Sequence, residues 1–596
     1  MDEALGRSVV SNGAGPMGGG APARWTMHWA EVAVFDANAA ALGIDGSELM
    51  AAAGAALAGQ AIHMIRSASD GLLSDRPVWI LCGPGNNGGD GFACALGLAE
   101  EGLRVIIQSS HAVQKSVTAQ HFRDRCRNAG IVEETWPLTI DGLKPCLVID
   151  CLLGAGAGVG ASFGVSNIFK NSSQTPRSPL LRPLRGAVAG VVDWVREIAP
   201  RSPILACDAP TGLSTEGVLV AAATVTFHSE KMGLRLAGGL TLAADGVGSE
   251  TAQTAAVVGS EKVSVGVRNG VAQIEAGLGQ TAVGVGELHI APLPWPEEVF
   301  DCGSGDVMRY PPLDVEARKG DRGRLLIVGG GPYHGAPLLA GAAAARVGCD
   351  LVHVAMPRAA SQRAKWPAEL IPEQLPDESK LTLASIEVIE ARLTKGRGCH
   401  ALLIGPGLGR DEATILAVQE LFRRAARLRI PTLIDADAIA ALPTGAWPAG
   451  LIGVATPHGR EALDWLVDVS PADALSYRGH SATSEEWSEA GLGEESEESA
   501  TIVITGPIDE LYGYGGRQAN AIGGHPRMAV GGTGDLLAGT IAGLLAQSMA
   551  PWPAARLGCA LLRKAGEAAA TRFGPGLVAS DVPPHIAESL NEWLPK

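Results

Sequence analysis

The chain has 596 residues. This is too long for a single hydrophobic core, so roughly two to four domains are expected. Hydrophobic residues make up 46% of the chain and charged residues 18%, as in globular proteins that bury a large core. The formal net charge is -16, and Lys and Arg form no block. Nucleic acid needs a concentrated basic surface and is therefore excluded as a partner.

The start of the chain and the cysteines indicate a cytoplasmic protein. Residues 1–27 are rich in Gly, Ala and Ser and lack the compact apolar segment of a signal peptide, so we interpret them as a flexible leader. No continuous apolar stretch of about 20 residues predicts a membrane span. The ten cysteines form no CxxC pair and no zinc-like spacing. Cys82, Cys146 and Cys207 lie in or beside apolar runs and are predicted to be core residues in a reducing compartment.

Two successive regions repeat the pattern of a parallel α/β sheet, in which a short apolar run and a glycine turn precede an alanine-rich helical stretch. One alanine-rich helix is predicted from about Glu31 to Ile65. The strands predicted in the first region are Val78–Cys82, Arg104–Ile107, Leu147–Ile149, Ile204–Cys207 and Thr224–Phe227. Those in the second region are Arg324–Val328, Leu351–Met356, Ala401–Ile404, Thr432–Ile434, Gly453–Ala455 and Ile502–Ile504. Because the runs are apolar throughout, we expect sheets that are covered on both faces.

A segment at about 235–315, rich in Gly, Val and Pro, separates the two regions and predicts a domain boundary between 295 and 318. We therefore expect an N-terminal domain over 28–300 and a C-terminal domain over 315–594. Two further segments, one polar and one acidic, are interpreted as solvated surface loops: 161–186 and 483–500.

The first predicted strand leads into residues 83–91, which read Gly-Pro-Gly-Asn-Asn-Gly-Gly-Asp-Gly, and a helix is predicted from Phe92. Glycines let the backbone approach a phosphate, and the helix that follows offers free N–H groups. Asn86 and Asn87 add neutral oxygens that suit a monovalent cation. The alternative is a purely structural turn.

Two more predicted strand ends carry acids. Asp150 leads into the glycine-rich residues 154–160, and Asp208 leads into Ala-Pro-Thr-Gly-Leu at 209–213. Ligands of open α/β sheets bind outside the carboxyl ends of the strands, so these three strand ends predict one convergent site. Taken singly, each acid could instead be only a helix cap.

At these residues the sequence resembles the NAD(P)H-hydrate epimerase family over about 28–235. The family pattern joins an Asn-Asn-Gly-Gly-Asp-Gly loop, an Asp before a Gly-x-Gly turn, and Asp-x-Pro-Ser-Gly-Leu, which here has Thr for Ser. Segments that contain Asp36 and Lys231 also match. The potassium ligands that the resemblance implies are Asn87, Asp150 and Thr211. The implied substrate contacts are Asn86, Asn87, Gly88, Gly89, Asp90, Gly154, Ala155, Gly156, Ala157, Gly158, Val159, Gly160 and Asp208.

The most informative motif of the second region is Met-Ala-Val-Gly-Gly-Thr-Gly-Asp-Leu-Leu-Ala-Gly at 528–539. A Gly-Thr-Gly turn at a helix N-terminus points several backbone N–H groups at one spot, which suits the charge on a transferring phosphoryl group. Asp535 follows the turn directly and could accept the proton of an attacking hydroxyl. The alternatives are an acid that only caps a helix and, for His458 in its Thr-Pro-His setting, a structural histidine.

Together with Gly-Pro-Gly-Leu-Gly at 405–409, these motifs resemble the ADP-dependent NAD(P)H-hydrate dehydratase family, a branch of the ribokinase-like fold, over about 318–590. The hydrate-binding residues that the resemblance implies are Ala336, Gly407, His458 and Asp535. The implied nucleotide-binding residues are Thr505, Gly506 and Gly534. The chain departs from the family in having Thr505 where Lys is usual and His525 where Asn is usual, and a threonine offers no cation to a phosphate.

The two resemblances imply a Rossmann-like three-layer αβα domain followed by a ribokinase-like αβα domain. The implied activities are epimerisation of R- and S-NAD(P)HX, and ADP-dependent dehydration of the S form with Asp535 as base and Asp150 or Asp208 as the epimerase acid. K+, Mg2+ and ADP, the substrates NADHX and NADPHX, and a homo-oligomer are also implied. Two alternatives stay open. Gly-Thr-Gly-Asp also occurs in ribokinase-like kinases of vitamin precursors, and the N-terminal domain could be only a binding scaffold.

Overall fold

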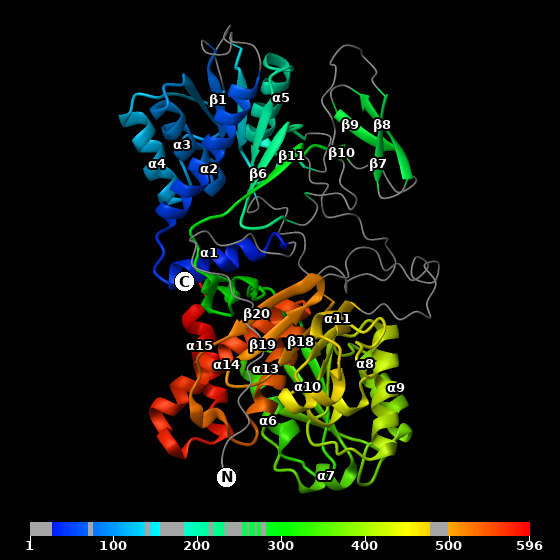
Figure 1. The fold of residues 1–596 in the computed structure, drawn as a ribbon. Coiled ribbons are helices and arrows are strands. Elements are labelled where there is room, and N and C mark those ends of the chain that lie inside the picture. The colour runs from blue at the N-terminus through cyan, green and yellow to red at the C-terminus, as the bar shows by residue number, and fades with distance from the viewer. Residues whose placement is uncertain are drawn as a thin grey trace, which may run out of the picture.

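A computed structural model of the chain describes its fold outside several gaps (Figure 1). The described residues are 27–68, 76–137, 144–154, 184–213, 218–231, 234, 253–258, 261–268, 271–275, 282–476 and 499–595. Between 253 and 283 only the backbone is described. The predicted leader lies outside the described residues except for Met27, and the insertion at 483–500 does so except for residues 499 and 500. The insertion at 161–186 also lies outside the described residues, except for residues 184–186.

The N-terminal lobe is built on a seven-stranded parallel sheet in the order β11-β6-β5-β4-β1-β2-β3. Its strands are β1 (Val78–Cys82), β2 (Val105–Ser109), β3 (Val132–Thr135), β4 (Leu147–Cys151), β5 (Ile204–Cys207), β6 (Ala223–Phe227) and β11 (Glu287–Ala291). The five predicted strands are confirmed. The edge strands β3 and β11 were not predicted, because half-exposed strands that carry charges lack a continuous apolar run.

Helices cover both faces of this sheet. One face packs against α2 (Gly46–Ser67), α3 (Asn86–Glu100) and α4 (Val117–Asn128). The other face, with Trp79 and Leu81, packs against α5 (Gly186–Ile198). The three-layer αβα arrangement is therefore as predicted. Cys82, Cys146 and Cys207 are buried in its core, also as predicted.

Two helix predictions were wrong. The single helix expected from Glu31 to Ile65 is in fact two helices, α1 (Glu31–Ala41) and α2. The chain breaks between them because Gly43 takes a left-handed φ of 83°. The Asp45 side chain then caps α2 by accepting a hydrogen bond from Ser47 N at 2.9 Å. The helix expected from Phe92 instead begins at Asn86, since Gly85 before it is extended and the glycines after it tolerate close packing.

The helix α2 has the length and mean hydropathy of a membrane span. No other described helix of 18 or more residues has this mean hydropathy. Its Met50, Ala53 and Leu57 are buried in the lobe's core. A Cβ on Gly54 would approach the Ala93 Cβ of α3 to 2.4 Å, so the two helices are in close contact. These contacts are those of a core helix.

The C-terminal lobe is built on a nine-stranded sheet in the order β14-β13-β12-β15-β16-β17-β18-β19-β20. It is parallel from β14 to β18 and antiparallel from β18 to β20. Its strands are β12 (Arg324–Val328), β13 (Leu351–Met356), β14 (Leu370–Gln374), β15 (Ala401–Ile404), β16 (Thr432–Ile434), β17 (Gly453–Ala455), β18 (Ala500–Ile504), β19 (Asp509–Gly513) and β20 (Arg517–Ala521). The six predicted strands are confirmed. The strands β14, β19 and β20 were not predicted, because exposed or half-exposed residues interrupt each of them.

This sheet also lies between two helical layers, as the predicted fold class requires (Figure 1). One layer holds α6 (Ala336–Arg346), α13 (Thr533–Ala546), α14 (Pro551–Phe573) and α15 (Pro583–Trp593). The other holds α8 (Ile386–Thr394), α9 (Glu412–Leu428), α10 (Gly459–Leu466) and α11 (Pro471–Ser476). A short helix, α7 (Arg358–Arg363), follows β13.

The segment at 235–315 is more than the connection that its composition suggested. It holds a separate antiparallel sheet of β7 (Gln253–Val258), β8 (Glu261–Arg268), β9 (Val271–Glu275) and β10 (Ala282–Val283). It also contributes β11 to the N-terminal sheet. Two 3-10 helices follow, η3 (Glu297–Phe300) and η4 (Ser304–Arg309), and α1 packs against them in the region between the two lobes (Figure 1).

Candidate active sites

The first candidate site begins where β1 meets α3. Asn86, Asn87, Gly88 and Gly89 form the first turn of α3, and Asp90 follows. A Cβ on Gly88 would lie 2.0 Å from the carbonyl oxygen of Gly83, so only glycine allows this turn to press against the strand end. The sequence predicted an anion-binding position in a loop before the helix. Since α3 begins at Asn86, such a position would instead be formed by the first backbone N–H groups of the helix itself.

The three predicted potassium ligands lie together. The Asp150 carboxylate at the end of β4 is fully buried and accepts hydrogen bonds from Thr211 N at 2.7 Å and Thr211 Oγ1 at 2.8 Å. A Cβ on Gly154 would come within 2.8 Å of Asn87 Oδ1, which places the Asn87 amide beside the residues that follow β4. Burial raises the pKa of Asp150 to about 6, against the lowering effect of the Thr211 hydrogen bonds.

The residues present fit a monovalent cation. The set supplies the amide oxygen of Asn87, the buried carboxylate of Asp150 and the hydroxyl oxygen of Thr211, which are the kinds of ligand that such a cation takes. The glycine-rich residues after Gly154 that are predicted to contact the substrate lie outside the described residues. They are Ala155, Gly156, Ala157, Gly158, Val159 and Gly160.

Asp208 holds the other end of this site. It is buried with a positive φ of 64°, a strained conformation of the kind that functional sites retain. The buried Lys231 ammonium lies 2.9 Å from Asp208 Oδ1 and also donates to Thr226 Oγ1 and to the carbonyl of Phe227, both at 2.7 Å. Lys231 was noted only as part of a matching segment. A single lysine after an apolar strand does not reveal in the sequence that it is buried against an acid.

Two more carboxylates share this electrostatic environment. Burial raises the pKa of Asp90 well above its usual range, and the negative charges of Asp208 and Asp36 raise it further, while Lys231 lowers it. The pKa of Asp36 is raised to about 6, by burial first and then by Asp208, with Lys231 opposing. The charges of Asp90 and Asp36 are therefore coupled to the Asp208–Lys231 pair.

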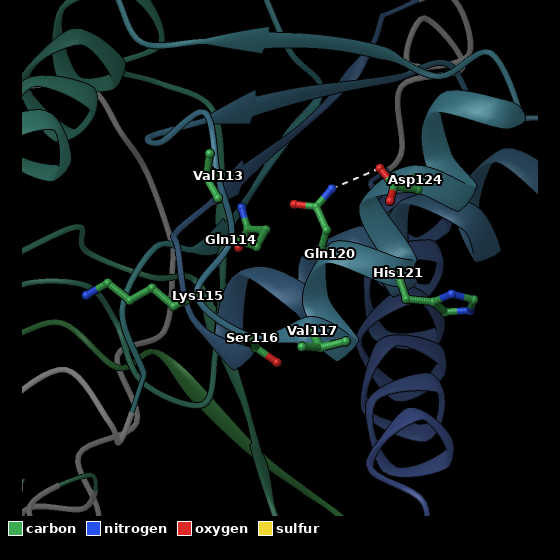
Figure 2. A pocket seen from close by; sticks show the side chains of 8 residues that line it. All are labelled: Val113, Gln114, Lys115, Ser116, Val117, Gln120, His121 and Asp124. Atoms are coloured by element: carbon green, nitrogen blue, oxygen red, sulfur yellow. Dashed lines mark hydrogen bonds between the residues drawn. The ribbon is translucent and has the colours of Figure 1, made fainter.

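A shallow hollow of about 400 Å³ lies at the start of α4, next to the glycine-rich segment (Figure 2). Lys115, which lines the hollow, donates its backbone N–H to the carbonyl of Pro84 at 2.7 Å, so the hollow adjoins the glycine-rich segment. Figure 2 shows the Gln120 amide held by Asp124 through a 2.9 Å hydrogen bond, and His121 turned away. The hollow is lined by Val113, Gln114, Lys115, Ser116, Val117, Gln120, His121 and Asp124, none of them a predicted site residue.

The second candidate site centres on the start of α13. Gly532 caps the helix with a left-handed φ of 100°, and Thr533 and Gly534 form its first turn, so the predicted Gly-Thr-Gly turn is at a helix N-terminus. Thr533 Oγ1 donates to the carbonyls of Met528 and Val530 at 2.8 and 2.9 Å, which fixes the turn. Burial, followed by the charge of Asp437, raises the pKa of Asp535 to about 6.

Acids that the sequence did not single out surround this turn. Asp435, at the end of β16, is buried and accepts from Thr456 Oγ1 at 2.7 Å, and burial raises its pKa to about 8. Asp437 accepts from Gly409 N at 2.8 Å and pairs with Arg410 at 3.0 Å. These contacts hold the Gly-Pro-Gly-Leu-Gly segment beside β16. Their Asp-Ala-Asp-Ala motif was visible in the sequence, but not the burial of the first acid.

The remaining predicted residues of this site converge from four elements. His458 caps α10, since its Nδ1 accepts from Arg460 N at 3.1 Å and Glu461 N at 3.2 Å, and its ring stays exposed. Its backbone pairs with Thr505, so a predicted hydrate-binding residue adjoins the predicted nucleotide segment. The other positions are Ala336 at the start of α6, Gly407 with φ 68°, and Gly506, whose N–H donates to Asp509 at 3.1 Å.

Family comparisons match the two lobes separately. Residues 46–233 match the family described as YjeF-related protein N-terminus, and residues 325–588 match the family described as NAD(P)H-hydrate dehydratase. The chain is 29% identical over 464 residues to the bifunctional NAD(P)H-hydrate repair enzyme Nnr of Pyrobaculum aerophilum, a match that covers 75% of this chain and 76% of that protein. It is 43% identical over 131 residues to the ATP-dependent (S)-NAD(P)H-hydrate dehydratase of Aedes aegypti, covering 22% and 37% respectively.

Solved structures resemble single lobes. The ADP/ATP-dependent NAD(P)H-hydrate dehydratase from Bacillus subtilis, co-crystallised with ATP/Mg2+, is 22% identical with a TM-score of 0.38, covering 49% of this chain and 96% of its own. Yeast ynu0 is 19% identical with a TM-score of 0.28, covering 35% of this chain and 81% of its own.

Proposed function

The chain belongs to the family that joins a YjeF-related N-terminus to an NAD(P)H-hydrate dehydratase domain, and on this premise we propose that it is a bifunctional enzyme that repairs hydrated NAD(P)H. The N-terminal lobe interconverts R- and S-NAD(P)HX. The C-terminal lobe dehydrates S-NAD(P)HX to NAD(P)H and converts ADP to AMP and phosphate. The observation that carries the proposal is the Gly532–Asp535 turn at the start of α13, in a chain that also holds the buried Asp208–Lys231 pair.

In the dehydratase, Asp535 accepts the proton of the ring hydroxyl as that oxygen attacks the terminal phosphorus of the nucleotide. A carboxyl with a pKa of about 6 is mostly ionised at neutral pH yet basic enough to take the proton. The backbone N–H groups at the start of α13, that of Gly534 among them, stabilise the charge on the phosphoryl oxygens. The lone pair of the ring nitrogen then expels phosphate from the ring carbon. The departing phosphate takes a proton from the adjacent carbon, which forms the ring C=C bond and restores the dihydronicotinamide.

The hydrate is held by Ala336, Gly407 and His458, and the nucleotide by Thr505, Gly506 and Gly534. This assignment is supported by the backbone pairing of His458 with Thr505. Mg2+ would neutralise charge on the nucleotide phosphates. Among the described residues no group of three His, Cys, Asp or Glu side chains could hold a metal ion, so we place Mg2+ on the nucleotide.

In the epimerase, Asp208 is the acid–base residue and Asp150 is a potassium ligand. This division is supported by their surroundings, because both Asp150 oxygens accept from Thr211 while Asp208 is paired with a buried ammonium. Potassium, held by Asn87, Asp150 and Thr211, would fix the turn that faces the dinucleotide. The first turn of α3 binds a phosphate of the substrate through its backbone N–H groups.

Analysis of the products tests the proposal against the kinase alternative. Purified protein is incubated with NADHX and ADP, and the mixture is resolved by chromatography and phosphorus NMR. NADH, AMP and inorganic phosphate in equal amounts support dehydration. A stable phosphorylated hydrate would contradict it and favour a kinase. We further propose a cytoplasmic homo-oligomer, which light scattering and cell fractionation test; the ten free cysteines suit a reducing compartment.

A further inference from the structure

The side chain of Arg563, in α14, joins the two segments that carry the proposed nucleotide-binding residues. The first segment follows β18 and contains Thr505 and Gly506, and the second follows β20 and runs from residue 523 to Gly534. Arg563 Nη2 donates to the carbonyl of Gly506 at 3.0 Å, and Nη1 donates to the carbonyl of Gly523 at 2.7 Å. Both segments are thus held from a helix that packs against β18, β19 and β20 (Figure 1).

The Arg563 guanidinium uses all of its donors in this way. A guanidinium carries five N–H groups. Nη1 also donates to the carbonyl of Pro507 at 2.8 Å, Nε donates to one Asp509 carboxylate oxygen at 2.9 Å, and Nη2 lies 2.8 Å from the other. With the two contacts above, these five contacts match the five N–H groups. Arg563 therefore holds the two segments and leaves no N–H group for a phosphate.

The same face of α14 holds the second segment at two more points. Glu567, one turn after Arg563, accepts from Gly524 N at 2.8 Å. A Cβ on Gly566 would lie 2.6 Å from Met528 Sδ, so Met528 packs closely on the helix. The carbonyl of Met528 in turn accepts from Thr533 Oγ1 at 2.8 Å. These contacts connect α14 to the first turn of α13.

The position of Thr505 depends on its backbone, because its side chain is short. A lysine has a flexible four-carbon stem, so its ammonium can reach a phosphate from a range of backbone positions. A threonine hydroxyl reaches a ligand only when the backbone itself lies close to it. A chain with Thr505 in place of the usual lysine therefore depends more strongly on contacts that fix this segment.

We propose that Arg563 is a positioning residue of the dehydratase, which holds the Thr505–Gly506 segment at a fixed distance from the Gly532–Asp535 turn so that both contact one ADP molecule. This inference rests on the nucleotide-binding residues proposed above. Arg563 acts through the two segments and does not touch the nucleotide.

The test measures ADP binding and ADP kinetics separately in full-length wild-type protein and Arg563→Lys. Lysine keeps the charge, but its three donors on one atom cannot replace a planar fork that reaches four residues. We expect Kd for ADP with Mg2+, from titration calorimetry, and KM for ADP to rise about 10-fold or more, since charge-assisted hydrogen bonds are lost. KM for S-NADHX should stay at the wild-type value, and kcat at saturating ADP should change far less than KM.

A second variant separates positioning from a general loss of structure. Arg563→Ala leaves a space that free guanidinium can enter, so guanidinium at a concentration too low to unfold the protein should restore part of the ADP affinity. Conversion of the separated R epimer of NADHX to the S epimer, followed by chromatography without nucleotide, should stay at the wild-type rate in both variants, because it takes place in the other lobe.

Arg572→Lys, the same substitution at an exposed position in the last turn of α14, is the matched control and should bind ADP as the wild type does. Wild-type affinity for ADP in Arg563→Lys overturns the inference. Equal loss of ADP affinity, epimerisation and melting temperature, without rescue by guanidinium, also overturns it, because the residue is then only structural. Wild-type protein that binds ADP but leaves the S epimer unchanged contradicts the proposed dehydratase function instead.

Discussion

At the scale of single residues, each site places an acid where protein atoms have replaced much of its water. Burial is the first cause of the raised pKa values of Asp535, Asp150 and Asp36, each of about 6. A carboxyl of this kind holds its proton more tightly than one in solution, so it can serve as a base or an acid near neutral pH. What differs between these acids is the set of hydrogen-bond partners.

The role of Asp535 is tested by Asp535→Asn. An amide cannot accept the hydroxyl proton, so we expect kcat for dehydration of the S epimer to fall by about 10² to 10⁴, the range for loss of a general base. Epimerisation should be unchanged. Asp468→Asn, at an exposed position, is the control and should keep both activities. An Asp535→Asn protein with normal turnover would remove the base from the mechanism.

The neighbouring Asp437 sets the pH dependence of the dehydratase. Because Asp535 must be ionised to act as base, kcat/KM should fall as the pH drops through about 6. The negative charge of Asp437 contributes to the raised pKa of Asp535, so Asp437→Asn should lower that pKa and move the inflection to lower pH. A pH–rate profile of both proteins measures this. A shift towards higher pH in the variant would contradict the assignment.

Sequence reasoning named the residues of these sites by motif, but it could not find the partners that set their charge. No role could be assigned to Lys231 or Asp435 from the sequence, because their surroundings depend on burial and on contacts across the chain. Lys231 lies against an acid 23 positions away, and Asp435 accepts a hydrogen bond from Thr456, 21 positions away. Such contacts depend on the tertiary fold and leave no local pattern.

At the scale of elements, the start of α3 shows why a glycine motif can be recognised and still be assigned to the wrong structure. Glycine-rich residues are typical of loops, and the sequence therefore predicted a loop up to Gly91. The structure needs these glycines for close packing instead, since side chains at Gly88 and Gly89 would overlap the Gly83 backbone and the Met50 side chain. The motif could be recognised in the sequence, but the start of the helix could not be predicted from it.

Gly88→Ala tests this packing. The added Cβ would lie 2.0 Å from a backbone oxygen, which cannot move away cheaply, so we expect a loss of about 1–3 kcal/mol in stability together with loss of epimerisation. Gly59→Ala in α2 is the control, because a Cβ there meets nothing within 4 Å and should leave stability equal or slightly higher. Thermal unfolding and the R-to-S assay measure both. Equal melting temperatures for the two variants would contradict the packing argument.

At the scale of the whole molecule, the sequence predicted two αβα lobes and most of their central strands, because buried parallel strands are continuous apolar runs. It did not predict the edge strands β3, β11, β14 and β20, nor β19 beside β20, because exposed positions in these strands interrupt such runs. Nor did it predict that α1 would rest on the second lobe, a contact between Glu31 and Trp552 that spans 521 positions of the chain.

The placement of the three proposed potassium ligands in one lobe predicts that K+ affects only one of the two activities. Asn87, Asp150 and Thr211 all lie at the strand ends of the N-terminal sheet. Replacement of K+ by a bulky organic cation in the buffer should therefore slow epimerisation of the R epimer several-fold and leave dehydration of the S epimer unchanged. Restoring K+ should reverse the effect. Equal slowing of both reactions would argue against a site confined to this lobe.

The central claim, that one chain performs both repair steps, is tested most directly with a racemic mixture of NADHX. The protein is added with K+, Mg2+ and ADP, and the return of the dihydronicotinamide absorbance is followed to its end, with ATP in a parallel reaction. Complete recovery is expected, because the epimerase supplies the S form as the dehydratase consumes it. Recovery that stops at half would contradict the epimerase, and no recovery with either nucleotide would contradict the dehydratase.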